Sequence, residues 1–276
     1  WQGSLAGSLP LPLPGAYLRG LDGQLVEVGS SIPSFLWGES FVGGRWYSHL
    51  ALLAVKTPLS LMLAFALAVG LSLPRPRLPG RETVLLLAYP VLLLMLLSIS
   101  SGRQLGTRAL LSAVPLVWLF AAANIGRAGP ARWPGRLAAA ALVGTLATSL
   151  LAYPDYLSHF NVLAGGSRQG HRYASESNLD IGQDLVKLAR YLERNGGHVQ
   201  LLYFGSVDPA LYGIDFEVPE GRLEPGLLAV SVTLYHMGYP MYDRGVLKRV
   251  GPVEVVGLGA PVAEIGGSIH VYRVSP

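Results

Sequence analysis

Four long apolar stretches dominate the first part of the chain and predict membrane-spanning helices. They cover residues 50–73, 83–100, 105–125 and 137–153. Each is close in length to the about 20 apolar residues with which a helix crosses a bilayer. The first stretch is interrupted by Lys56, Thr57 and Pro58, shortly after its start. We therefore expect an α-helical membrane region of about four transmembrane helices between residues 49 and 153.

After residue 153 the pattern becomes that of a globular domain. Residues 181–196 carry apolar side chains at helical spacing and end in Asn195-Gly196, which predicts an amphipathic helix. Short apolar or alternating runs predict strands at 198–205, 226–237, 253–258 and 268–274, and residues 208–214 predict a turn with a short helix. One helix followed by several strands predicts a small α/β domain over residues 154–276.

The segment before the first span, residues 1–48, is rich in Pro and Gly and predicts a loop that lies on the membrane surface. Its last part concentrates aromatic side chains, which suit the headgroup layer: Phe35, Trp37, Phe41, Trp46 and Tyr47.

Composition and charge agree with a membrane protein and give it an orientation. Only 14% of the residues are charged and 51% are hydrophobic, whereas a soluble domain carries about 25% charged residues. The short loops after the first and third stretches are basic, and the positive-inside rule places them in the cytoplasm; they hold Arg75, Arg77, Arg81, Arg127, Arg132 and Arg136. Residues 1–48 and 154–276 are then extracytoplasmic.

Two function classes are excluded or disfavoured by the same counts. The chain has no cysteine, so it forms no disulfide and no cysteine-based metal site. No basic face with interleaved aromatic residues appears outside the loops, so nucleic acid is not an expected partner. The expected partner is the lipid bilayer.

Lys56 is the first candidate for chemistry, because an ionisable residue within a span is by default a functional hypothesis. Pro58 loosens the turn before it and exposes carbonyl groups beside the cation. Arg103 and Arg108, between the second and third stretches, lie on the same predicted side, and guanidinium groups bind phosphate in bidentate fashion. We expect Lys56, Arg108 and Arg103 to hold a lipid phosphate. The alternative is that Lys56 snorkels to the headgroups and the arginines anchor the interface.

A dense polar cluster precedes the predicted helix, in the stretch "HRYASESNLDIGQDL". We expect it to form a sugar- or acceptor-binding edge, with Glu176, Asn178, Asp180, Gln183 and Asp184 as its residues. The alternative is that Asn178 or Asp180 caps the helix while the acids favour its positive end. No zinc or calcium ligand pattern is present, and His159, His171, His198, His236 and His270 are interpreted as surface or core histidines.

Several stretches, in order, resemble a known family: "LPLPGAYLRGLDG", "FLWGESFVGGRWYSHLALLAVKTPLSLML", "GTRALLSAVPLVWLF" and above all "YPDYLSHFNVLAGGSRQGHRYASESNLDIGQDLVKLARYLERNG" with "LLYFGSVDPALYGI". The chain resembles the C-terminal half of bacterial phospholipid carrier-dependent glycosyltransferases, which are similar to dolichyl-phosphate-mannose protein mannosyltransferases. The resemblance implies a C-type glycosyltransferase in the bacterial inner membrane. Such an enzyme moves a sugar from a polyprenyl-phosphate carrier to an acceptor on the outer face.

The resemblance also bears on the catalytic groups. In this family an acidic residue of the first outer loop commonly acts as base or metal ligand, and this chain is expected to be a fragment that begins after that loop. Glu39 and Asp180 are weaker candidates for the base. No cofactor is assigned, although the resemblance allows a divalent metal ion in the full-length enzyme. The chain departs from the family in having Arg108-Ala109 for an Arg-His pair and Ile181 for a tryptophan.

A second function class stays open. The chain would then be a membrane-anchored, extracytoplasmic module that binds carbohydrate or peptide without catalysis. A transporter is disfavoured, because the predicted spans contain few polar groups.

Overall fold

The computed structural model describes residues 14–29, 33–73, 80–99, 106–127, 132–219, 223–237, 239–243, 246–250 and 258–276. Arg103 and most of the predicted strand at 253–258 lie outside these residues.

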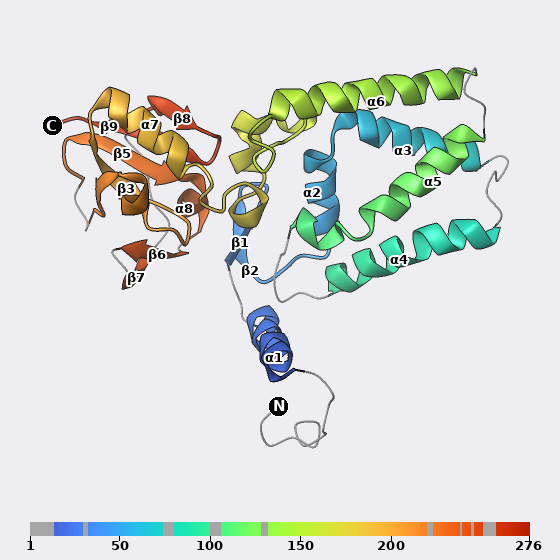
Figure 1. Cartoon of the computed structure of the whole chain (residues 1–276), viewed down its shortest axis with the longest axis horizontal. Helices are drawn as coiled ribbons and strands as arrows, with labels where there is room; N and C mark the ends of the chain where they lie inside the picture. The colour runs from blue at the N-terminus through green and yellow to red at the C-terminus, as the bar shows by residue number, and fades with distance from the viewer. Residues whose placement is uncertain are drawn as a thin grey trace.

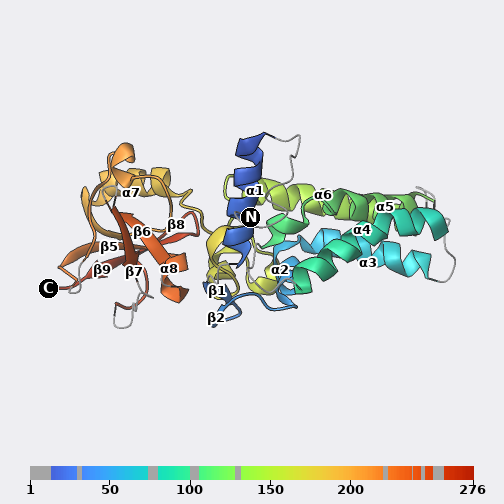
Figure 2. The same ribbon diagram turned by 90° about the horizontal axis from the view of Figure 1, so that it is seen from below.

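A group of apolar helices forms one end of the molecule: α3 (Leu59–Ser72), α4 (Gly80–Ile99), α5 (Val114–Gly126) and α6 (Trp133–Ala152). They run side by side, with α3 packed against α5 and α6, and α4 against α5 (Figures 1 and 2). Helices α4 and α6 are each long and apolar enough to cross a membrane. Helix α5 has 13 residues and is therefore about 20 Å long, which is shorter than the about 30 Å of a hydrocarbon core.

The predicted first span is broken in the middle. Helix α2 (Ser48–Lys56) ends before Thr57, and α3 begins after Pro58 at an angle of 113°. Thr57 has the extended conformation (φ −76°, ψ 131°) because a residue before proline is pushed out of the helical region. The stretch 50–73, predicted as one spanning helix, thus consists of two helices that meet at this bend. The described residues contain two helices that could span a membrane, or three if the bent pair is one span.

The N-terminal segment is more ordered than the predicted loop. It contains α1 (Gly15–Gly29) and a hairpin of β1 (Pro33–Leu36) and β2 (Glu39–Val42). The two turn residues, Trp37 and Gly38, have positive φ angles of 51° and 81°, as the tight turns that suit hairpin twist require. Leu36 forms a bridge to Ala174, so the hairpin packs on the chain that follows α6.

The other end of the molecule is a mixed α/β domain, as predicted. Its sheet has the order β4-β3-β5-β9-β8, built from β3 (His198–Leu202), β4 (Asp215–Glu217), β5 (Gly226–Ser231), β8 (Ala263–Ile265) and β9 (Ile269–Val274). Strands β3, β4 and β5 are parallel, and β9 runs antiparallel to its neighbours. A separate hairpin consists of β6 (Tyr239–Asp243) and β7 (Val246–Val250).

The helix expected at 181–196 is α7 (Leu185–Asn195), which starts four residues later and ends at Gly196 with φ 115°. Leu185, Leu188 and Leu192 are buried at helical spacing and pack on the sheet. The strand expected at 226–237 is β5 followed by a short helix, α8 (Val232–His236). The strand expected at 268–274 is β9, and the short helix expected near 209 is η6 (Pro209–Tyr212), a 3₁₀ helix.

The four apolar helices alternate in direction relative to the sheet domain. Helices α3 and α5 begin, and α4 and α6 end, on the side that faces this domain (Figure 1). At the opposite end Arg127, which follows α5, forms an ion pair of 3.2 Å with Glu82 in the first turn of α4. The basic loops expected in the cytoplasm are thus attached to the helix ends away from the sheet domain.

Candidate functional site

Lys56 lies at the helix break and points toward the chain that leaves α6. Its ammonium group donates hydrogen bonds to the carbonyl oxygens of Leu157 (2.6 Å) and Asn178 (2.5 Å). It also lies 4.6 Å from the centre of the Phe160 ring, within cation–π range. An ammonium group has three N–H donors, so one is left beyond these two bonds. Lys56 therefore connects α2 with the segments around Leu157 and Asn178. A lysine that only extends toward the lipid headgroups would not need these contacts.

Asn161 satisfies the carbonyl groups that the helix break exposes. Its side-chain nitrogen donates to the carbonyl oxygens of Ala54 (2.7 Å) and Thr57 (2.8 Å), and its backbone N–H donates to Val55 (2.8 Å). Its Oδ1 accepts from the backbone N–H of Leu163 at 3.0 Å, which caps η3 (Val162–Ala164). Asn161 was not among the residues predicted to be functional. A local signal exists, since Asn is a preferred N-cap residue, but its contact with α2 has no local signature.

Asn178 connects Lys56 with the turn that carries Arg108. Its carbonyl oxygen accepts from Lys56, and its Oδ1 accepts from the backbone N–H of Thr107 at 3.3 Å. Gly106 has φ 68°, and a Cβ there would lie 2.1 Å from Asn178 Oδ1, so the close approach requires glycine. Arg108 lies in η2 (Thr107–Leu110) and is exposed. The structure thus brings the segments of Lys56 and Arg108 together through a residue that we had assigned to sugar binding.

Asp180 lies inside the sheet domain, next to the carboxyl end of β5. Its carboxyl group is fully buried and accepts hydrogen bonds from the backbone N–H of Gly182 (3.0 Å) and from Thr233 Oγ1 (3.2 Å). Burial raises its pKa to about 7, and the nearby Asp184 adds to the effect, against the opposing hydrogen bonds from Gly182, Thr233 and Ser231. Through these hydrogen bonds the Asp180 carboxyl group holds the loop of residues 178–184 in place.

Asp184 fastens the sheet domain to the exit of α6. Its buried carboxylate accepts from Ser268 Oγ at 2.6 Å and forms an ion pair of 2.9 Å with Lys187. Lys187 also pairs with Asp155, which follows α6. Asp184 precedes α7 without a side-chain cap bond. The alternative in which Asn178 or Asp180 caps this helix does not hold, because Asp184 occupies the N-cap position and the chain makes a separate turn before it.

The remaining members of the polar cluster have internal contacts. The backbone N–H of Glu176 donates to Thr233 Oγ1 at 3.1 Å, and Glu176 has a positive φ of 54°. Gln183 is exposed, and its Oε1 accepts from the backbone N–H of Ile181 at 2.9 Å. Ile181, which replaces the family's tryptophan, is 57% exposed. The cluster therefore builds a turn rather than one open edge.

Glu39 lies on the exposed β2 strand. Its carboxylate forms an ion pair of 2.8 Å with Arg45, and the Arg45 guanidinium lies 4.5 Å from the Phe41 ring centre.

Three histidines that are far apart in sequence lie together between the hairpin and the sheet domain. The rings of His171 and His270 are 5.1 Å apart, and His236 stacks on Phe35 at 3.7 Å. Burial lowers the pKa of both His236 and His270 to about 4, and the charge on His171 adds to the effect. Phe35 is thus buried inside the protein, in contrast to its predicted place among lipid headgroups.

Among the described residues, no group of three or more His, Asp or Glu side chains is arranged to hold a metal ion. Comparison of the chain with protein-family models, curated proteins and solved structures gives no significant match. The resemblance to glycosyltransferases is therefore a prediction from the quoted motifs.

Proposed function

We propose that this chain is part of an integral-membrane glycosyltransferase that takes a sugar from a polyprenyl-phosphate carrier and transfers it to an acceptor at the extracytoplasmic face. The observation that carries the proposal is that Asn178 binds both Lys56 and the turn that contains Arg108. This contact lies at the helix ends that face the sheet domain. A carrier whose tail lies in the bilayer would present its phosphate at this level.

Helix lengths support a recessed site. Helix α3 has 14 residues and α5 has 13, whereas α4 and α6 have 20 each. At 1.5 Å per residue, the short helices are about 10 Å shorter than the long ones. Lys56 and Arg108 both precede a short helix. A depression between longer helices would let a lipid phosphate reach these cations without leaving the membrane.

The proposed chemistry assigns different roles to the two cations. Transfer breaks the bond between the sugar C1 and the phosphate oxygen and forms a bond from C1 to the acceptor oxygen, whose proton passes to a base. The departing lipid phosphate carries the negative charge, which preorganised cations stabilise. Arg108, whose exposed side chain has no hydrogen bond or ion pair within the described part of the chain, would contact the phosphate directly. Lys56 would contribute a fixed charge and its remaining N–H donor.

Binding of the free polyprenyl phosphate tests this proposal without knowledge of the sugar, since every donor leaves the same lipid phosphate. Purified protein in detergent would be mixed with radiolabelled polyprenyl phosphate, with the unphosphorylated polyprenol as control. Loss of a bidentate arginine contact costs about 1.5–3 kcal/mol, so Arg108→Gln should weaken phosphate binding at least about tenfold. Arg190→Gln, on the exposed side of α7, should leave it unchanged. Equal binding of the phosphate and the alcohol would contradict the proposal.

The alternative proposal is a membrane-anchored module that binds carbohydrate or peptide without catalysis. It predicts no preference for polyprenyl phosphate over polyprenol, together with ligand binding by the sheet domain. The same binding assay therefore separates the two proposals.

A further inference from the structure

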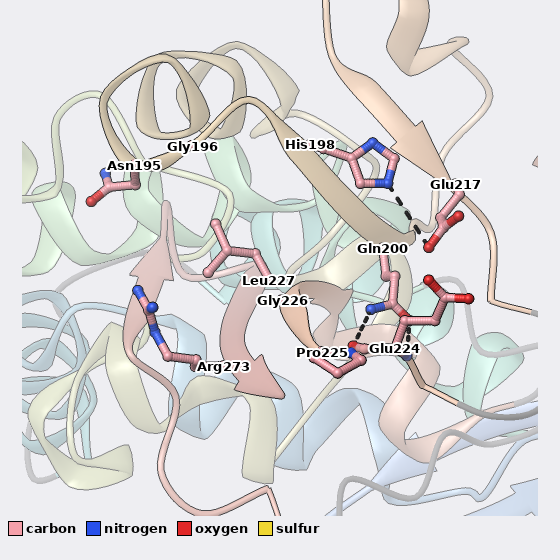
Figure 3. A pocket seen from close by; sticks show the side chains of 10 residues that line it. All are labelled: Asn195, Gly196, His198, Gln200, Glu217, Glu224, Pro225, Gly226, Leu227 and Arg273. Carbon is pink, nitrogen blue, oxygen red and sulfur yellow. Dashed lines mark hydrogen bonds and ion pairs between the residues drawn. The ribbon is translucent and has the colours of Figure 1, made fainter. Parts of the chain in front are cut away.

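A cavity of about 360 Å³ opens on the sheet domain where β3 and β5 begin and β9 ends (Figure 3). The C-terminus, close to Arg273 in sequence, lies at the end of this domain away from the membrane helices (Figures 1 and 2). The cavity therefore belongs to a different part of the molecule from Lys56 and Arg108. Its volume is at the lower end of the range for small-molecule sites.

The walls of the cavity carry opposite charges. Figure 3 shows the Arg273 guanidinium on one side and the carboxylates of Glu217 and Glu224 on the other. Within the part of the chain that the structure describes, neither the Arg273 nor the Glu224 side chain has an ion pair or hydrogen bond. Two uncompensated charges of opposite sign thus face one space and do not neutralise each other.

The acidic wall is held in place by its neighbours. The side chain of Gln200 is 3% exposed, donates to the carbonyl oxygen of Glu224 at 2.6 Å and accepts from its backbone N–H at 2.9 Å. On the same side His198 contacts Asp215 at 3.1 Å, and its other ring nitrogen lies 3.9 Å from Glu217. The main chain that carries Glu224 is therefore held in place before a ligand arrives, which lowers the entropy cost of binding.

Glycine keeps the rim of the cavity open. Gly196 and Gly226 have φ angles of 115° and 146°, and a Cβ at either residue would meet no atom within 4 Å. Both glycines are exposed, so the rim of the cavity is open to solvent. Among the residues that the structure describes, the lining contains no Phe, Tyr or Trp, so these residues offer a sugar no aromatic face on which to pack.

We propose that this cavity binds a zwitterionic ligand of about dipeptide size, with its ammonium group at Glu217 and Glu224 and its anionic group at Arg273. A ligand with one charge would leave the opposite wall unpaired, whereas a zwitterion compensates both walls. A peptide with free termini and a phosphoethanolamine headgroup share this chemistry. The inference is independent of the proposed transferase function.

Calorimetric titration of the whole purified chain in detergent tests the proposal with three probes. Dialanine is zwitterionic, N-acetyl-dialanine methylamide has a similar shape without charge, and phosphoethanolamine represents the lipid source. We expect both zwitterions to bind and the capped peptide to bind at least tenfold more weakly. Arg273→Gln and Glu224→Gln should each weaken dialanine binding at least tenfold, while Arg190→Gln on α7 should have no effect.

The outcomes are decisive in both directions. Tighter binding of dialanine supports a peptide ligand, and tighter binding of phosphoethanolamine supports a lipid headgroup. Arg273, Glu224 and Arg190 are all exposed, so their substitution preserves the fold, which an unchanged melting temperature verifies. Equal binding of the capped peptide, unchanged binding in both cavity variants, or no binding of either zwitterion at millimolar concentration would overturn the proposal.

Discussion

The Lys56 ammonium donates a hydrogen bond to the carbonyl oxygen of Asn178 at 2.5 Å, across 122 residues of sequence. The same Asn178 accepts from Thr107 through its side chain. Asn178 thus holds the break between α2 and α3 close to the turn that contains Arg108.

Replacement of Lys56 should therefore impair stability as well as any lipid binding. Lys56→Met keeps the apolar stem and removes both hydrogen bonds, which leaves two carbonyl groups without their donor. Each hydrogen bond from a charged donor contributes about 1.5–3 kcal/mol, so we expect a loss of about 3 kcal/mol and a lower melting temperature in detergent. Arg190→Met should melt like the wild type. A Lys56→Met protein with unchanged melting would show that these bonds do not support the fold.

Asn161→Ala should destabilise the helix break. It removes two side-chain donors to carbonyl oxygens and the cap of η3, and the unpaired buried groups cost about 2 kcal/mol in sum. The matched control is Asn195→Ala, since Asn195 is exposed and has one bond to the preceding turn of α7. Chemical unfolding of both variants measures the difference. Equal stability of the two would contradict the role given to Asn161.

Acid should destabilise the contact between the hairpin and the sheet domain. The pKa of His270 falls from 6.5 to about 4 in the folded protein, so the unfolded chain binds more protons between these values. Stability is then complete above pH 6.5 and declines as the pH falls toward 4, by at most about 3 kcal/mol for this group at 1.36 kcal/mol per pKa unit. His270→Gln should reduce the loss between pH 7.5 and pH 5. An identical pH profile in the variant would refute the assignment.

Asp180 should have the opposite effect on the pH dependence of stability from His270. Its pKa rises from 3.8 to about 7 on folding, so its contribution is most favourable below pH 4 and is lost as the pH rises through 7. Asp180→Asn resembles the protonated acid at every pH. The variant should gain stability relative to the wild type progressively as the pH rises from 4 to 8, as measured by urea unfolding. A constant difference across this range would argue against a titrating Asp180.

The local pattern was sufficient where an element is stabilised by its own periodicity. The leucines of α7 and the alternation in β9 predicted both elements, and Gly196 marked the end of α7. The end of β5 was missed because Val232 and Leu234 continue the apolar run beyond Ser231. The side chains of Ser231 and Thr233 instead bind partners outside the sheet.

Long-range contacts set the limit of prediction for the candidate site. Lys56 and Pro58 were recognised as unusual, yet the bend between α2 and α3 depends on Asn161, which is about a hundred residues away. In the same way, His171, His236 and His270 form one group only because the hairpin, η4 (Ser167–Arg172) and the sheet meet. The spacing of residues along the sequence does not predict such long-range contacts.

The corner between α2 and α3 has a consequence for biosynthesis. The groups that complete it belong to residues 157, 161 and 178, all of which leave the ribosome after α6. Until then the carbonyl oxygens of the corner lack these protein donors, so this early part of the chain reaches its final shape only after α6 and the segment that follows it have been synthesised.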